Sequence, residues 1–141
     1  MKGQFYLHFD KMPTGTAQQK GVRVVHGKPY FYTKPNVEGA EVLFKTALLP
    51  YRPKKPSDKS VRLTVTFCFD TKNKKLWGQP KPTRPDTDNY LKLFKDCMTE
   101  VGFWKDDAQV TEEHVFKRYA EKATIAVYWE EVLDDADTER K

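Results

Sequence analysis

Cysteine is scarce in this sequence. Only Cys68 and Cys97 are present, without a Cys-X-X-Cys spacing and without a neighbouring histidine, so the familiar zinc-binding patterns are excluded. Cys68 falls in an apolar strand-like run and Cys97 in a helix-like run, and we expect both to be small buried hydrophobic residues. The three histidines are scattered along the chain and receive no functional assignment: His8, His26 and His114.

Long apolar runs are also missing. No window approaches the roughly 18 to 20 apolar residues that a membrane-spanning helix needs, and residues 1–10 lack the charged-then-apolar order of a secretory signal. We therefore expect a cytoplasmic protein with no membrane partner. The chain of 141 residues shows no repeat and no linker, which predicts one folded domain.

Acidic residues are unevenly distributed. The net charge is +5, but residues 131–141 hold five acids against two bases, and the remaining chain has 23 basic and 15 acidic residues. Residues 71–85 contain no acid and three prolines, and we interpret them as a loop. Its bases are Lys72, Lys74, Lys75, Lys81 and Arg84. Such a positive surplus favours a polyanionic partner, although a solvated surface that keeps the protein soluble accounts for the composition equally well.

Hydrophobic periodicity predicts both strands and helices. A polar loop is expected over residues 12–20. One helix is expected over about residues 35–49, and a second from Asp86 or Asp88 to Val101, with Gly102 as its C-terminal cap. Residues 134–141 are expected to form a mobile acidic tail. Strands are expected at residues 4–9, 22–26, 28–32, 61–70, 109–119 and 122–130, the last two as a closing antiparallel pair.

The start of the second helix gathers charged side chains. Asp86 and Asp88 are two residues apart, so an extended backbone places them on one face. Asp88 and Lys92 are four residues apart and adjacent on a helix surface. Carboxylate oxygens suit Mg²⁺, a bound metal can activate water for attack on a phosphate, and Lys92 would stabilise the charge that develops there. The segment therefore predicts metal-dependent hydrolysis of a phosphodiester.

Helix capping and calcium binding are the alternative roles for these aspartates. An Asp at a helix start commonly caps free backbone N–H groups. Capping needs only one Asp or Asn, however, and here Asp86, Asp88 and Asn89 crowd together next to a basic loop. An EF-hand calcium loop is excluded, because the positions that require Gly and Glu hold Leu91 and Cys97.

Three segments resemble the RusA-type Holliday-junction resolvases, in a form often carried by phages: RPDTDNYLK at residues 84–92, Lys95-Asp96, and GFWKDDAQV at residues 102–110. The resemblance implies an α/β (α+β) fold with a small mixed sheet and two main helices, in one nuclease domain over residues 1–133. It also implies a magnesium-dependent endodeoxyribonuclease, with Mn²⁺ as a substitute metal, that resolves four-way DNA junctions by paired symmetric nicks. Residues 12–20 do not match the family's DNA-contacting segments.

The resemblance assigns roles by position. It makes Asp86, Asp88 and Asp107 the metal-binding acids and Lys92 the catalytic lysine. The supporting positions are Asn89, Asp96 and Asp106. From charge, we expect DNA contacts in the basic loop of residues 71–84 and in a second basic run, Arg52, Lys54, Lys55, Lys59 and Arg62. Trp77 or Phe103 could stack at an opened junction, although ordinary core packing accounts for either aromatic residue as well.

Asp107 raises a question of distance. A helix from Asp88 to Val101 is about 20 Å long, and nothing after it suggests a return along its length, so Asp107 should lie near the C-terminal end of its own helix. In a homodimer with antiparallel helices, which would also suit two nicks in one junction, Asp107 could complete the partner's site. Equally, the loop could curl back within one chain. The dimer arrangement would use one apolar stripe of the helix as its contact between chains. The same stripe could instead simply cover the sheet of its own chain: Leu91, Phe94, Met98 and Val101.

Two rival functions stay open at this point. The nuclease could act on other branched DNA, such as flaps or replication forks. In a different class, a non-catalytic DNA-structure-binding protein would use the same aspartates only to cap a helix and to pair with lysines.

Overall fold

A four-stranded mixed sheet forms the centre of the protein. The computed structural model describes residues 1–14, 20–25, 27–33 and 35–132. The sheet has the order β1-β6-β4-β5, in which β6 pairs antiparallel with both of its neighbours and β4 runs parallel to β5. Its strands are β1 (Lys2–Phe9), β4 (Val61–Asp70), β5 (Val110–Ala120) and β6 (Ala123–Glu131). Together with two helices, this sheet confirms the α+β class expected from the sequence.

The predicted closing antiparallel pair is wrong. Residues 109–119 and 122–130 do form strands, but β4 lies between them. Alternate residues of β4 from Val61 to Phe67 are fully buried, so this strand supplies much of the core. β4 is also hydrogen-bonded to a neighbouring strand on each side. The short connection between β5 and β6 passes the end of β4, where Asp70 is opposite Ala120. Closeness in sequence therefore did not mean pairing in the sheet.

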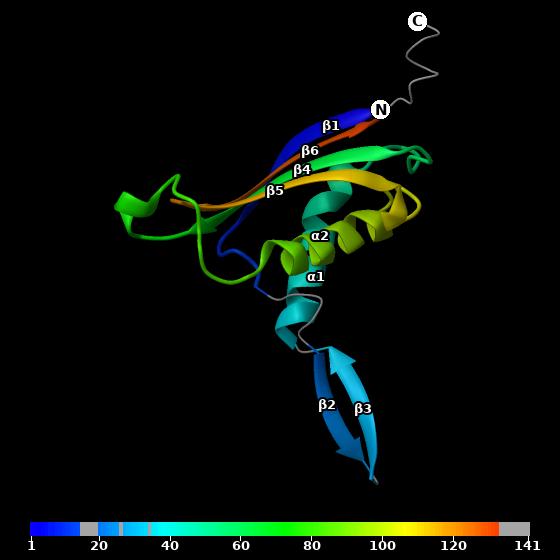
Figure 1. Ribbon diagram of the computed structural model, residues 1–141, viewed down its shortest axis with the longest axis vertical. Helices are drawn as coiled ribbons and strands as arrows, with labels where there is room; N and C mark the ends of the chain where they lie inside the picture. Colours follow the sequence, from blue (N-terminus) through cyan, green and yellow to red (C-terminus); the bar gives the residue numbers. More distant parts are fainter. Residues whose placement is uncertain (15–19, 26, 34, 133–141) are drawn as a thin grey trace, which may run out of the picture.

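Both helices lie on one face of the sheet (Figure 1). They are α1 (Pro35–Leu48) and α2 (Thr87–Val101). Phe44 of α1 and Phe94 of α2 pack edge to face with ring centroids 5.2 Å apart, and Phe67 of β4 lies 5.6 Å from Phe94. These edge-to-face contacts are typical of a well-ordered aromatic core.

The apolar stripe of α2 covers the sheet of its own chain. Leu91, Phe94 and Met98 are at most 3% exposed, and Val101 packs against the same core. Of the two arrangements that the sequence left open for this stripe, contact with a second copy is wrong and coverage of the sheet is confirmed.

The ends of α2 match the sequence prediction. Asp86 occupies the N-cap position, and Gly102 ends the helix with a φ of 103°, a left-handed conformation that glycine adopts without strain. None of the helices in the described part of the chain is long and apolar enough to span a membrane.

Two further strands stand apart from the body. β2 (Lys20–Val25) and β3 (Lys28–Thr33) pair only with each other as a hairpin, which Figure 1 shows beyond the N-terminal end of α1. Short 3-10 turns are η1 (Leu49–Tyr51), η2 (Lys74–Leu76) and η3 (Asp107–Gln109). Part of the predicted polar loop, residues 15–19, and the predicted acidic tail lie outside the described residues.

The two cysteines are unpaired thiols. Cys97 is 1% exposed, as expected, whereas Cys68 is only partly buried because it lies on the face of β4 opposite the helices. The expectation of burial is confirmed for Cys97 alone.

Candidate active site

Asp86 and Asp88 lie at the N-terminal end of α2, and both are exposed. Asp86 holds the N-cap position with φ −68° and ψ 143°, yet its side chain accepts no capping hydrogen bond. Asp106, by contrast, caps η3 by accepting a hydrogen bond of 2.8 Å from the amide of Ala108. Capping therefore does not use the Asp86 carboxylate, which remains available to a ligand. The free amides and the positive dipole end of α2 also suit a phosphate.

Two lysines hold the segment that leads to Asp86. The ammonium of Lys117, on β5, donates to the carbonyl oxygens of Thr83 at 2.6 Å and Pro85 at 2.7 Å. Lys81 donates to the Thr83 hydroxyl at 2.6 Å and also to the carbonyl of Arg84. Burial lowers the pKa of both lysines. The sequence analysis missed Lys117; the available signal was a lysine inside a predicted strand.

The exposed face of α2 carries an alternating row of charges. Asp88, Lys92 and Asp96 follow one another at four-residue intervals, and the Lys92 ammonium lies 3.4 Å from the Asp96 carboxylate. The Lys92 side chain is 60% exposed. It can therefore reach a bound phosphate without losing a buried contact.

Asp107 lies at the opposite end of α2. Its carboxylate accepts a hydrogen bond from the Thr99 hydroxyl, which in turn accepts one of 2.7 Å from the Trp104 indole. Burial alone would raise the pKa of Asp107, but hydrogen bonds with Asp96 and Thr99 lower it. Burial, followed by the hydrogen bond and negative charge of Asp107, raises the pKa of Asp96 to about 6. The sequence analysis missed Thr99 and Trp104, which form this chain of hydrogen bonds to Asp107.

The four acids thus form two separate pairs. Asp86 and Asp88 are at one end of α2, while Asp96 and Asp107 line a shallow hollow of about 330 Å³ at the other end. From Asp88 to Thr99 the helix rises by about 17 Å. Among the described residues, no group of three His, Cys, Asp or Glu side chains is placed to hold one metal ion. The prediction that Asp107 lies near the C-terminal end of its own helix is confirmed.

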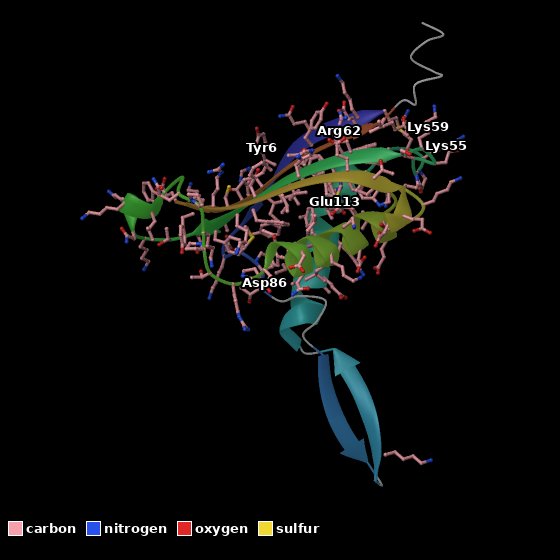
Figure 2. All side chains as sticks on the ribbon, in the orientation of Figure 1. Tyr6, Lys55, Lys59, Arg62, Asp86 and Glu113 are labelled. Carbon is pink, nitrogen blue, oxygen red and sulfur yellow. The ribbon has the colours of Figure 1, made fainter. Side chains whose placement is uncertain are left out.

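Basic side chains flank both ends of α2. In the loop that leads to Asp86, four of the five predicted DNA-contacting residues are exposed, whereas Lys81 is partly buried. The exposed four are Lys72, Lys74, Lys75 and Arg84. The second basic run lies beside η3, because the Gln109 side chain donates to the carbonyl of Lys59 at 2.9 Å. Figure 2 shows Lys55 and Lys59 at one end of the sheet, away from Asp86.

Three of the predicted DNA contacts have other partners. Arg62 forms ion pairs with Glu112 at 2.5 Å and Glu130 at 2.7 Å, so its charge is already balanced. Phe103 is fully buried and cannot stack on a base, which makes that prediction wrong. Trp77 is partly buried and donates its indole N–H to the carbonyl of Thr71 at 2.9 Å.

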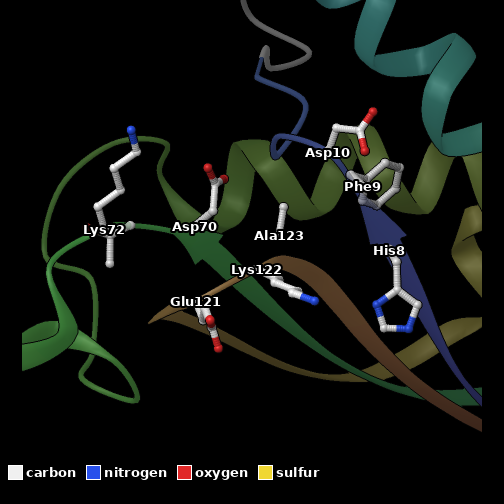
Figure 3. A pocket seen from close by; sticks show the side chains of 9 residues that line it. His8, Phe9, Asp10, Asp70, Lys72, Glu121, Lys122 and Ala123 are labelled. Atoms are coloured by element: carbon white, nitrogen blue, oxygen red, sulfur yellow. The ribbon is translucent and has the colours of Figure 1, made fainter.

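A larger hollow of about 670 Å³ lies where β1 and β4 end, away from both acidic pairs. Its charged side chains are of both signs, including Lys72 and Lys122. Figure 3 shows the carboxylates of Asp10, Asp70 and Glu121 pointing in different directions. The hollow therefore offers no converging set of ligands, and we assign it no role in the reaction.

Comparison with known proteins decides the family. The model of the family Endodeoxyribonuclease RusA matches residues 10–128, a stretch that includes both acidic pairs. The chain belongs to the RusA endodeoxyribonuclease family. It is therefore an endodeoxyribonuclease, and the resemblance seen in its motifs is confirmed.

Individual relatives agree with the RusA family assignment. The crossover junction endodeoxyribonuclease rusA of Lactococcus phage r1t is 39% identical over 134 residues, which cover 94% of this chain and 100% of that protein. The crossover junction endodeoxyribonuclease RusA of Escherichia coli strain K12 is 36% identical over 59 residues, which cover 42% of this chain and 49% of that protein.

Proposed function

We propose that this RusA-family enzyme resolves four-way DNA junctions by paired, magnesium-dependent nicks, acting as a homodimer. The observation that carries the proposal is the uncapped carboxylate of Asp86, which lies two residues before Asp88. Asp88 in turn lies about one helical turn before Lys92. Full-length similarity to a phage protein named as a crossover junction endodeoxyribonuclease supports the junction as substrate.

The metal would be held by Asp86, Asp88 and Asp107. Mg²⁺ usually takes one or two carboxylates from a protein and fills its remaining positions with water and substrate phosphate, which suits the exposed carboxylates of Asp86 and Asp88. When bound, such a metal supplies an activated water and stabilises charge on the phosphate and on the leaving oxygen. Mn²⁺ has similar ligand preferences and is expected to substitute.

The protein's own side chains would position the phosphate. Lys92 would place its ammonium beside the phosphate oxygen that gains charge, and Asp96 would orient Lys92 through their 3.4 Å contact. Asn89 shares the first turn of α2 with Asp88. Asp106 would fix η3, and thereby Asp107, through its capping hydrogen bond.

We further propose that Asp107 serves the site of the partner subunit. Asp107 lies about 17 Å along α2 from the Asp88 of its own chain, too far for one metal to bind both. In a two-fold dimer with antiparallel α2 helices, the C-terminal end of one helix approaches the N-terminal end of the other. Two such sites would give one nick in each of two strands, as junction resolution requires.

The basic side chains would hold the DNA through its phosphates. Lys72, Lys74, Lys75 and Arg84 would act from the loop that leads to Asp86, together with Lys81, which also supports the loop. Arg52, Lys54, Lys55 and Lys59 would act beside Asp107.

A nicking assay tests this function. A synthetic four-way junction is incubated with the wild-type protein, with and without Mg²⁺, and with the D88N variant. We expect paired nicks only in the presence of metal, and a loss of at least about a hundredfold in D88N. D58N, at an exposed aspartate outside both pairs, is the matched control and should cleave normally.

Two outcomes would point to the rival functions. Preferential cutting of a flap or a replication fork over the four-way junction would make the enzyme a nuclease for other branched DNA. Tight junction binding without nicking, by the wild type as much as by D86N, would leave only a non-catalytic binder of DNA structure.

A further inference from the structure

Two stretches of the chain carry positive charge and no acidic residue. Residues 11–37 and residues 71–85 each contain five lysines or arginines and no Asp or Glu. Together they hold ten of the 25 basic residues of the chain and none of its 20 acidic residues. The second stretch is the loop that leads to Asp86. The first contains β2 and β3, which we call the basic hairpin.

The register of the basic hairpin brings its charged and aromatic residues to one face. Arg23 is paired with Tyr30, and Val25 with Lys28. Paired positions of an antiparallel ladder share a face, and so do alternate positions along a strand. Arg23, Lys28, Tyr30 and Tyr32 therefore belong to the same face. Arginine, lysine and tyrosine side chains are among those that bind DNA phosphates.

The basic hairpin lies on the same side of the sheet as the candidate active site. Figure 1 shows it beyond the N-terminal end of α1, on the helix-covered side of the sheet that also carries α2. Each of its strands has six residues, which gives it a length of about 20 Å. The hairpin can therefore touch DNA that lies well away from the body of the protein.

Tyr90 of α2 contacts the segments on both sides of the basic hairpin. The Tyr90 hydroxyl donates a hydrogen bond to the carbonyl oxygen of Pro13, which precedes the hairpin. The Tyr90 ring packs edge to face against Phe44 of α1, which follows the hairpin, with ring centroids 5.8 Å apart. The flanking segments of the hairpin are thus held against the helix whose first turn carries Asp88.

We infer that the basic hairpin binds the phosphates of a second duplex of branched DNA, one that is not held against α2. This inference rests on the proposed function for its branched substrate. A linear duplex held along α2 has no second duplex to meet the hairpin, whereas a four-way junction has one. The hairpin therefore makes the enzyme favour branched over linear DNA.

A second copy of the chain is the other partner that a projecting hairpin could meet. The alternate positions of the hairpin, Val22, Val24 and Phe31, are apolar and would suit a protein contact. The acid-free composition selects DNA instead, because each lysine or arginine that meets a phosphate releases condensed counterions. The chain also belongs to a family whose substrate is DNA.

Binding measured without divalent metal tests the inference, since cleavage then does not interfere. Fluorescence anisotropy compares a four-way junction with a linear duplex. R23E/K28E should weaken junction binding about tenfold or more, lower the magnitude of the salt slope by about two, and change the affinity for linear duplex by less than about twofold. The matched control is K2E/K122E, which reverses two exposed lysines outside both acid-free stretches and should bind like the wild type. Circular dichroism verifies that each variant is folded.

Three results would overturn the inference. The first is a folded R23E/K28E variant that binds the junction as tightly as the wild type. The second is an equal loss of affinity for junction and linear duplex, which would remove the preference for branched DNA. The third is a loss of self-association in sedimentation velocity with junction binding unchanged, which would assign the hairpin to a second copy.

Photo-cross-linking gives a second measurement that does not depend on weakening the contact. In a C68S background, K28C carrying a thiol-linked photoreactive group should cross-link to junction DNA, because Lys28 is exposed on the basic hairpin. K2C, carrying the same group on β1, should not. Equal cross-linking at the two positions would contradict a DNA contact of the hairpin.

These measurements separate the hairpin contact from the reaction. Junction resolution by the wild type, with junction binding unchanged in R23E/K28E, would keep the proposed function and reject the role of the hairpin. A selective loss of junction binding in R23E/K28E, in a protein that never nicks a junction, would do the reverse.

Discussion

The ammonium of Lys117 donates a hydrogen bond of 2.7 Å to the carbonyl oxygen of Pro85, the residue immediately before Asp86. Lys117 also donates to the carbonyl of Thr83. A side chain on β5 therefore fixes the backbone that delivers the first aspartate of the site. Lys117 touches backbone and not the reacting groups, so we regard it as a positioning residue.

Replacing Lys117 should slow cleavage without weakening DNA binding. K117M removes both hydrogen bonds and frees the segment before Asp86, and misplacement of a catalytic group by a fraction of an ångström is costly. We expect kcat for junction cleavage to fall about tenfold or more and KM to stay within about twofold. K122M, in the exposed turn after β5, is the control. Partial rescue by K117R is expected; an unchanged kcat in K117M would show that the loop needs no such support.

Mixing two inactive variants should restore cutting if Asp107 acts in the partner's site. A heterodimer of a D88N subunit and a D107N subunit would then hold one complete site and one site lacking both carboxylates. We expect single-strand nicks from the mixture and no paired resolution, while either variant alone stays inactive. The measurement is a nicked-junction assay after joint refolding or subunit exchange.

If each site were built within one chain, both sites of that heterodimer would be damaged. No recovery in a mixture shown to contain heterodimers would therefore reject the shared site, even if the enzyme resolves junctions.

Charge reversal in the basic loop should weaken binding in a salt-dependent way. The triple variant K72E/K74E/K75E removes three exposed cations of the loop that leads to α2. The slope of log affinity against log salt concentration should then fall in magnitude by about three, with an affinity loss for junction and linear duplex alike. Fluorescence anisotropy at several salt concentrations measures it. A salt slope equal to that of the wild type would place the phosphate contacts elsewhere.

Glu131 should stabilise the fold at neutral pH but not in acid. Hydrogen bonds from the N-terminal ammonium, at 2.5 Å, and from the Ser57 hydroxyl, at 2.6 Å, lower the pKa of Glu131 below its ordinary value. A lowered carboxylate pKa contributes stability above the unfolded-state pKa, and this contribution is lost as pH falls through the folded-state pKa. E131Q should therefore lower the free energy of unfolding at pH 7 by about 1 kcal/mol or less, since the pair is near the surface.

Urea denaturation at pH 7 and at about pH 3 checks this expectation, with E121Q, at an exposed turn position, as the control. The difference between E131Q and the wild type should shrink at the lower pH. A difference that grows in acid would reverse the sign of the linkage.

Local features of the sequence determined several of the elements and their ends. The alternation of residues 61–70 predicted β4 with its observed bounds, and Asp86 and Gly102 marked both ends of α2. The rise per residue of a helix then placed Asp107 far from Asp88. These predictions held because hydrogen bonding and side-chain periodicity within one element depend on neighbours in the chain.

Only the tertiary structure decided which elements meet. It placed β4 between β5 and β6, turned the apolar stripe of α2 toward its own sheet, buried Phe103, and aligned Lys117 with Pro85 and Thr99 with Asp107. Each outcome depends on contacts between residues distant in sequence, where the burial of apolar area selects among several locally acceptable arrangements.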